Sequence, residues 1–332
     1  MLTRRSVIGS AMATTALAAP SVARAQSRSF SFAYDQPRTT GYGILADIFS
    51  NKLKELSKGE MTIDQFPGAQ LGQEPQILQK VRSGDIDFII SSTANASTLA
   101  PESGVFSLHY IFTSEAHLAK AIADPAVVAA VRAMFAERVQ GAQVLAVATL
   151  GLRYIYAKKE VRRVEDMKGL KVRVQATKTE DTHFPSYGAQ VVHMPFGDVY
   201  TSLQTGVVDA AENGVNVYLS NKHYEVAPVL SWTQHEANNS VVWVSDKAWN
   251  SMSAEQKGWV QEAANTVGRE QPARALKLEE ESAVRLEKIG VKLVKDVDKS
   301  GFIKLAMPIQ DLLATELGPN AVKILGLVRG IK

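Results

Sequence analysis

Two stretches of sequence decide the fold: Asp166–Val174, which reads DMKGLKVRV, and Pro195–Asn213, which reads PFGDVYTSLQTGVVDAAEN. Alternating apolar residues at the end of the first stretch predict a short strand that carries Arg173. The second stretch predicts a helix followed by another strand, with Asn213 just past it. A strand, a helix and a second strand in this order indicate an α/β unit with parallel strands.

The same alternation of strand-like and helical segments runs along the rest of the chain and predicts α/β lobes with largely parallel sheets. The sequence SGDID at residues 83–87 resembles TGVVD at 205–209, since in each a glycine follows a helical segment and precedes a strand. This internal sequence similarity favours two lobes of similar structure. We expect lobe I at residues 26–150 plus about 239–278, and lobe II at 151–238 plus about 279–332.

One predicted helix is much longer than average and runs from Ser253 to about Gly290. Ser253 and Gln256 have capping-box spacing, and Pro272 should kink the helix. A helix of ~35 residues would be ~50 Å long, enough to cross two lobes. Two successive helices within one lobe are the alternative.

Residues 1–25 have the pattern of an export signal, with Arg4-Arg5 near the start, an apolar run, and Ala23-Arg24-Ala25 as the cleavage site. The paired arginines after Thr3 are twin-arginine-like, and an ordinary secretory signal is the alternative. We therefore expect a periplasmic protein. The signal holds three basic residues and no acidic one, so the 37 basic residues of the chain become 37 − 3 = 34 against 34 acidic ones.

This balanced charge gives no support for a nucleic-acid partner or an anionic membrane surface. The chain has no cysteine, which excludes disulfides, thiol catalysis and thiolate metal sites. His235-Glu236-Ala237-Asn238-Asn239 starts like a zinc-protease motif but has asparagine where the second histidine belongs, so it predicts no zinc site. We expect no metal, no cofactor and no enzymatic activity.

A glycine pattern, Gly41-x-Gly43-x-x-Ala46, lies between a predicted strand and a predicted helix and is the strongest competing motif. It would make the chain an exported NAD(P)-dependent oxidoreductase. A dinucleotide turn should follow its strand almost directly, however, and here Gln36–Thr40 intervenes. A flexible loop that enters a helix is the simpler interpretation.

On pattern alone, Arg173 and Arg153 point away from the apolar face of their strands and would be solvated. Asp198 is predicted to cap the helix at 199–205, and Glu212-Asn213 would by default form a solvated turn. A guanidinium is nevertheless the side chain best suited to grip a carboxylate through two parallel hydrogen bonds.

Taken together, these segments resemble the substrate-binding proteins of TRAP (tripartite ATP-independent periplasmic) transporters, the DctP-type family. The resemblance rests on Arg153, 166–174, Pro195-Phe196, the helix at 199–204 and Val208–Asn213, and it extends to Gln70-Leu71-Gly72 and 83–88. It implies a two-lobed periplasmic binding protein fold of the α/β class, with a ligand cleft between the lobes and a long helix spanning both.

The resemblance also implies a site. Arg173 would form the salt bridge to a substrate carboxylate, Arg153 would supplement it, and Asn213 would hydrogen-bond the same group. Phe196 would pack on the ligand, and His235 and Asp35 would lie near the cleft. In this chain Ser92 and Asn95 replace an acidic and a basic residue of the sialic-acid-binding members, which argues against sialic acid. Leu108-His109-Tyr110 replaces the usual Leu-Pro-aromatic step, so His109 could reshape the roof of the pocket.

We therefore expect a monomeric solute-binding protein that captures a small organic acid, closes around it and delivers it to the membrane subunits of an ion-gradient-driven TRAP transporter. A dicarboxylate, a sugar acid and another short acid all fit the sequence. A ligand-binding sensor component is a further alternative to delivery.

Overall fold

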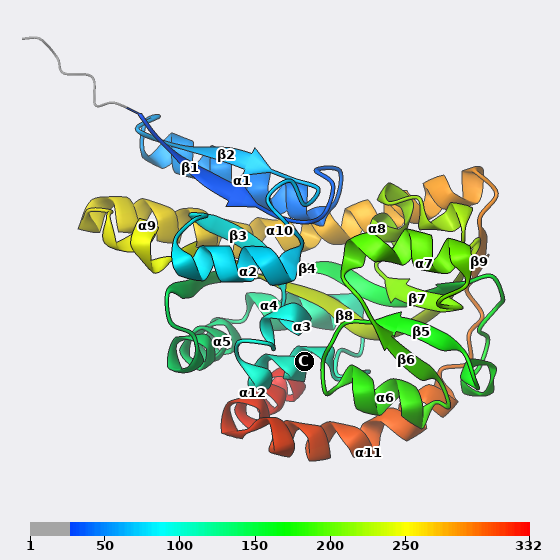
Figure 1. The fold of residues 1–332 in the computed structure, drawn as a ribbon. Coiled ribbons are helices and arrows are strands. Elements are labelled where there is room, and N and C mark those ends of the chain that lie inside the picture. Colours follow the sequence, from blue (N-terminus) through cyan, green and yellow to red (C-terminus); the bar gives the residue numbers. More distant parts are fainter. Residues whose placement is uncertain (1–26) are drawn as a thin grey trace, which may run out of the picture.

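The computed structural model describes residues 27–332, so the predicted export signal lies outside the described residues. Two long antiparallel strands, β4 (Ala142–Ala157) and β8 (Val229–Ser245), cross the middle of the molecule (Figure 1). They pair along almost their whole length, from Ala142 with Ser245 to Ala157 with Val229. Every other strand of the sheet is attached to one end or the other of this pair.

Three parallel strands, in the order β2 (Met61–Phe66), β1 (Arg28–Ala33) and β3 (Phe88–Ser92), join the sheet where β3 pairs with Ser240–Val244 of β8. The helices and 3-10 turn of this half are α1 (Gly41–Leu56), α2 (Glu74–Ser83), α3 (Thr93–Ala96), η1 (Pro101–Ser107), α4 (Glu115–Ala123), α5 (Pro125–Arg138) and α9 (Asp246–Asn250).

A second parallel set, β7 (Ala210–Asn213), β5 (Lys171–Val174) and β6 (Gln190–His193), joins at the other end of the pair, where β7 lies beside Tyr154–Ala157 of β4. The strand β9 (Lys292–Val294) pairs with the start of β8. The helices and 3-10 turns here are η2 (Val164–Met167), α6 (Glu180–Ser186), η3 (Phe196–Asp198), α7 (Val199–Thr205), α8 (Val215–Ser220) and η4 (His223–Glu225), and α11 (Ser300–Leu317) and α12 (Pro319–Gly330) close the chain.

The helix α10 (Ala254–Lys288) is a single element of 35 residues, as predicted, with Ser253 and Gln256 forming the capping box. It continues through the buried Pro272 and packs on α1, β4 and α8 (Figure 1). Gln271 lies against the crossing strand: its Nε2 donates to Thr149 O at 2.6 Å, and its Oε1 accepts from Thr149 N–H at 3.2 Å. The helix thus braces the crossing strands between the two strand sets.

Both glycines of the predicted helix ends adopt the left-handed conformation that a side chain disfavours: Gly84 and Gly206 each have φ 77° and cap α2 and α7. The strand β4 runs unbroken through residues 144–157, with a register shift between Thr149 and Leu152 in its pairing with β8. The predicted cap by Asp198 is wrong, because Asp198 already has helical φ −90°, ψ −9° and its side chain accepts no capping hydrogen bond.

The helices of the described residues include none that is both long and apolar enough to cross a bilayer.

Candidate ligand-binding site

A narrow cavity of about 20 Å³ lies where the two strand sets face each other beside β4. Polar side chains make up most of its lining. Seven of the predicted site residues line it: Asp35, Ser92, Asn95, Arg153, Arg173, Phe196 and Asn213. The other lining residues are Gln36, Tyr42, Glu74, Leu150, Gln175 and Asn238.

Arg173 lies on β5 and its side chain is buried, with a residue exposure of 3%, so the solvated arginine expected from its strand pattern is wrong. Arg173 lines the cavity together with residues of both strand sets. Its Nε and Nη2 donate to Met194 O at 3.2 and 2.9 Å, and its guanidinium lies 5.8 Å from the Phe196 ring centre. Burial lowers its pKa. No carboxylate among residues 27–332 forms an ion pair with it.

Arg153 on β4, unlike Arg173, forms ion pairs with carboxylates of the protein. Its guanidinium pairs with the carboxylates of Glu212, through Nη2 at 2.5 Å and through Nε, and of Glu236 at 3.2 Å. Burial acts to lower the pKa of Arg153, but the two carboxylates outweigh it and hold the pKa above its usual range. Arg153 is therefore already neutralised within the protein, whereas Arg173 is not.

Asn213 ends β7 and is buried, as is Glu212, so the solvated turn expected there is wrong: β7 pairs with both β4 and β5. The Asn213 Oδ1 accepts hydrogen bonds from Asn238 Nδ2 at 2.7 Å and from Gly214 N–H at 2.9 Å. These two donors fix the orientation of the amide, and its NH₂ group remains available as a donor.

Glu74 at the start of α2 organises the opposite strand set. It accepts hydrogen bonds from Tyr42 Oη at 3.0 Å, Ser92 N–H at 2.9 Å, Ser92 Oγ at 2.7 Å and Asn95 Nδ2 at 2.7 Å. Asp35 lies nearby, and burial together with the charge of Glu74 raises its pKa well above the usual range. The cavity thus contains acidic as well as basic groups.

Two cavity residues, one from each strand set, were missed although a signal for them existed in the sequence. Gln175 is two residues beyond Arg173, and strand alternation puts both on one face. Glu74 follows the recognised Gln70-Leu71-Gly72 by only two positions. Nothing in the sequence indicated that Tyr42 or Asn238 would join them, because their approach depends on how the strands cross.

His235 is the one predicted site residue that does not line the cavity. It is buried behind Arg153, with its Nε2 3.8 Å from Glu212 Oε2. His109 is also buried away from the cavity lining, 4.8 Å from His235 between ring centres.

The glycine pattern at residues 41–46 has a packing explanation. A Cβ on Gly43 would lie 1.8 Å from the backbone oxygen of Arg38, and one on Gly41 would lie 2.4 Å from Leu150 Cδ2. The helix α1 begins at Gly41, whereas β1 ends at Ala33, so no phosphate-binding turn joins them directly. The geometry does not favour the oxidoreductase alternative.

The fold and the site define a two-lobed binding protein with a polar, arginine-bearing cleft. Comparison with known proteins agrees, because residues 32–315 match the family described as "Bacterial extracellular solute-binding protein, family 7". The chain belongs to this family.

Relatives with known binding properties extend the comparison. The chain is 29% identical over 309 residues, covering 92% of it and 93% of the relative, to the 2,3-diketo-L-gulonate-binding periplasmic protein of Escherichia coli (strain K12). A TRAP periplasmic solute-binding protein from Xanthobacter autotrophicus with bound β-D-galacturonate superimposes with a TM-score of 0.84 at 28% identity, covering 91% of this chain and all of that one. One from Polaromonas bound to D-erythronate gives 0.85 at 26% identity, with 92% and 99% covered.

The predicted family, two-lobed fold and periplasmic location are confirmed, and the protein is a TRAP solute-binding protein for organic acids. The family consists of substrate-binding proteins that work with TRAP membrane subunits.

Proposed function

We propose that the cleft captures a polyhydroxylated monocarboxylic acid of the sugar-acid class and presents it to TRAP membrane subunits without chemical change. The observation that carries this proposal is the charge state of Arg173. Its guanidinium is buried beside the cavity and has no ion-pair partner among the described residues. A buried cation of this kind favours an anionic ligand.

The remaining cavity groups suit the rest of a sugar acid. Asn213 would donate its amide to the same carboxylate, Phe196 would pack on the carbon skeleton, and Arg153 would support the carboxylate end while it stays paired with Glu212. Asp35, Glu74 and Asn95 offer oxygen acceptors for hydroxyl groups. The charge of Glu74 disfavours a second carboxylate on the ligand, which argues against a dicarboxylate.

The cleft would bind by closure of two lobes. We assign lobe I to residues 26–150 plus about 239–278 and lobe II to 151–238 plus about 279–332. The strand sets support this assignment, because β3 attaches to the Ser240–Val244 end of β8 and β7 attaches to the Tyr154–Ala157 end of β4. A ligand that touches Arg173 on β5 and Asn95 after β3 bridges the two sets and so favours the closed state. We take the acting unit to be one chain.

A thermal-shift screen of sugar acids, followed by calorimetry, tests this function. A true ligand at 100 times its dissociation constant adds about 2.7 kcal/mol to the free energy of unfolding. Arg173→Ala should weaken its binding by about 2–5 kcal/mol. Arg173→Lys should also bind poorly, because a point charge cannot form the paired hydrogen bonds.

The exposed Arg163 provides the matched control, since Arg163→Ala removes an arginine of the same set of elements away from the cavity. Binding within threefold of wild type by both Arg173 variants would remove Arg173 from the site. A screen in which dicarboxylates bind and monocarboxylic sugar acids do not would overturn the proposed ligand class.

A further inference from the structure

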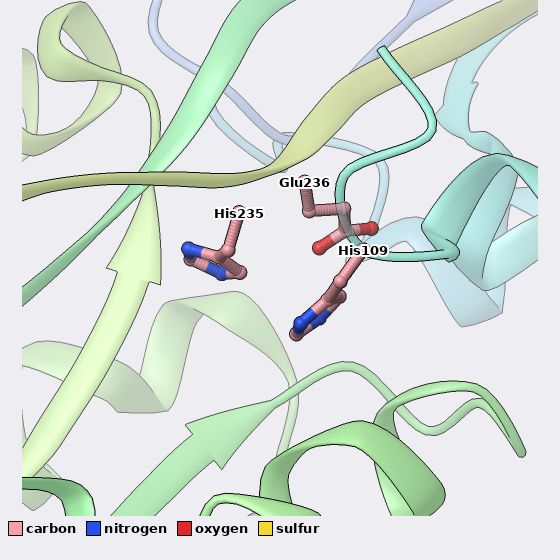
Figure 2. A group of neighbouring side chains, drawn as sticks. All are labelled: His109, His235 and Glu236. Carbon is pink, nitrogen blue, oxygen red and sulfur yellow. The ribbon is translucent and has the colours of Figure 1, made fainter. Parts of the chain in front are cut away.

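A second cluster of ionisable side chains lies behind Arg153, away from the cavity. His109 follows η1, His235 and Glu236 lie on β8, and Glu180 lies on α6. All four are buried, with residue exposures of 0%, 1%, 4% and 1%. Figure 2 shows the two imidazoles and the Glu236 carboxylate turned toward one common space.

The two imidazoles are held in the same way. Nδ1 of His109 lies 2.9 Å from Tyr187 Oη, and Nδ1 of His235 lies 2.9 Å from Thr233 Oγ1. In both rings the other nitrogen, Nε2, has no hydrogen-bond partner among residues 27–332. Histidines that bind a metal through one nitrogen are commonly oriented by a hydrogen bond at the other.

Carboxylate oxygens face these free nitrogens. Oε2 of Glu180 lies 3.5 Å from His109 Nε2, and neither oxygen of Glu180 has a hydrogen-bond partner within the described chain. Three donor atoms, one each from His109, His235 and Glu236, all lie within 4.8 Å of one another. Leaving such buried polar atoms unpaired costs free energy, which a single partner bound among them would recover.

The chemistry of the donor atoms indicates what that partner is. Imidazole nitrogen and carboxylate oxygen are both ligands of divalent transition-metal ions. A divalent cation placed among these atoms would give the unpaired nitrogens of both histidines and the carboxylate of Glu180 a partner.

We propose that His109, His235 and Glu236 bind a divalent transition-metal ion, with Glu180 as the fourth ligand. Two imidazoles and two carboxylates suit zinc, which takes nitrogen and oxygen ligands in tetrahedral geometry. Zinc bonds of ~2.0–2.2 Å place donors about 3.4 Å apart, so the side chains draw inward by about 1 Å on binding. The site goes beyond the proposed ligand capture and does not depend on it.

The ion would have a structural effect. It joins β8 to the segment after η1 and to α6, and it fixes Glu236, which also holds Arg153 at 3.2 Å. Because the ligands are buried, the ion enters as the chain folds, and its binding adds to the stability of the folded state.

The test measures zinc in the full exported protein purified from zinc-supplemented cells without a histidine tag. Mass spectrometry of the metals should find about one zinc per chain after dialysis against a mild chelator. Refolding with Co²⁺ should produce the visible bands of a four-coordinate ion with nitrogen and oxygen donors. Unfolding and refolding with a strong chelator should lower the thermal midpoint, and refolding with zinc should restore it.

Variants locate the ion. Tyr187→Phe removes only the hydroxyl at His109 Nδ1 and should weaken zinc binding about 10- to 100-fold. His109→Gln should abolish retention. His193→Gln is the matched control, because His193 is a half-exposed histidine paired with Asp181 outside the cluster.

Two results would overturn the proposal. Wild-type protein that retains no zinc and shows no Co²⁺ bands would mean that protons balance the cluster instead. Zinc that survives His109→Gln, or is lost in His193→Gln, would place the ion elsewhere. If His109→Gln does not fold, Tyr187→Phe and the wild-type Co²⁺ spectrum still decide, and sugar-acid binding is scored separately.

Discussion

Gln175 Nε2 donates a hydrogen bond to Ser92 Oγ at 2.8 Å, which joins the strand set of β5 to that of β3 across the cavity. A second such bond runs from Gly197 N–H to Gln73 Oε1 at 3.3 Å. These bonds exist only when the two sets are close together, so they stabilise the closed arrangement independently of a ligand.

Gln175→Ala should therefore shift the ligand-free protein toward an open form. A hydrogen bond contributes about 0.5–1.5 kcal/mol, so ligand affinity should fall about 2- to 10-fold through the closed-state population. The chain has no cysteine, and spin labels at Lys58→Cys and Thr201→Cys would report the distance between the lobes. Gln190→Ala, at an exposed glutamine of β6, is the control. Identical distance distributions for wild type and Gln175→Ala would contradict the closure role.

Arg153→Ala should damage the fold more than Arg173→Ala does. Removing Arg153 leaves Glu212 and Glu236 buried without their counter-charge, which should lower the free energy of unfolding by about 3–5 kcal/mol. Removing Arg173 breaks the hydrogen bonds to Met194 O and the contact with the Phe196 ring but leaves no ion-paired carboxylate behind, so it should cost much less in the ligand-free state. Urea unfolding of the two variants checks this order. Equal losses would show that the ion pairs at Arg153 contribute little.

Glu74→Gln should change the selectivity of the cleft as well as its affinity. Glutamine carries no charge, and its amide oxygen accepts the three hydrogen bonds from Ser92 and Asn95 more weakly than the carboxylate oxygen Oε2 does, so sugar-acid binding should weaken by about 1–3 kcal/mol. A dicarboxylate should lose less, because the repulsion by Glu74 is removed. Calorimetry with galacturonate and with galactarate, its dicarboxylate counterpart, measures the ratio. Glu60→Gln, at an exposed position of the same set, should leave the ratio unchanged.

The sequence predicted those features that depend on residues close together in the chain, and it did not predict those that depend on residues far apart. The long helix and its Ser253 cap, the glycine ends at Gly84 and Gly206, and the strand that carries Arg173 depend on neighbours a few residues away. The burial of Arg173 and of Asn213 depends on strands that are distant in sequence, and the resemblance to a family supplied that information. The pattern alone predicted solvated side chains there.

What remained beyond prediction involves contacts between segments that no local pattern connects. The carboxylate of Glu74 binds Ser92 and Asn95 because α2 begins where β3 ends. His235 was expected near the cleft, but Arg153 and Glu212 lie between His235 and the cleft. His109 and Glu180 lie on the side of His235 that faces away from the cleft. The position of His235 in its strand does not distinguish a side chain in the cleft from one in the buried cluster behind Arg153.

Glu279 on α10 should make stability depend on pH. It is buried and accepts N–H bonds from Val215 at 2.6 Å and Asn216 at 2.8 Å, which join α10 to the start of α8. Burial raises its pKa from 4.5 to about 8, the two N–H groups oppose this shift, and the charge of Glu115 on α4 adds to it. Because the folded-state pKa is the higher one, the favourable contribution of the protonated form is fully present below pH 4.5 and is lost as the pH rises to about 8.

Glu279→Gln, which stays neutral, should accordingly match wild type near pH 5 and exceed it near pH 8.5 by on the order of a few kcal/mol. Urea unfolding at several pH values between these limits checks the difference. Glu281→Gln is the control, since Glu281 is exposed on the same helix near Lys277 and should leave the pH dependence unchanged. A constant difference between Glu279→Gln and wild type across this range would show that Glu279 remains ionised when buried, with the two N–H groups of α8 outweighing the effect of burial.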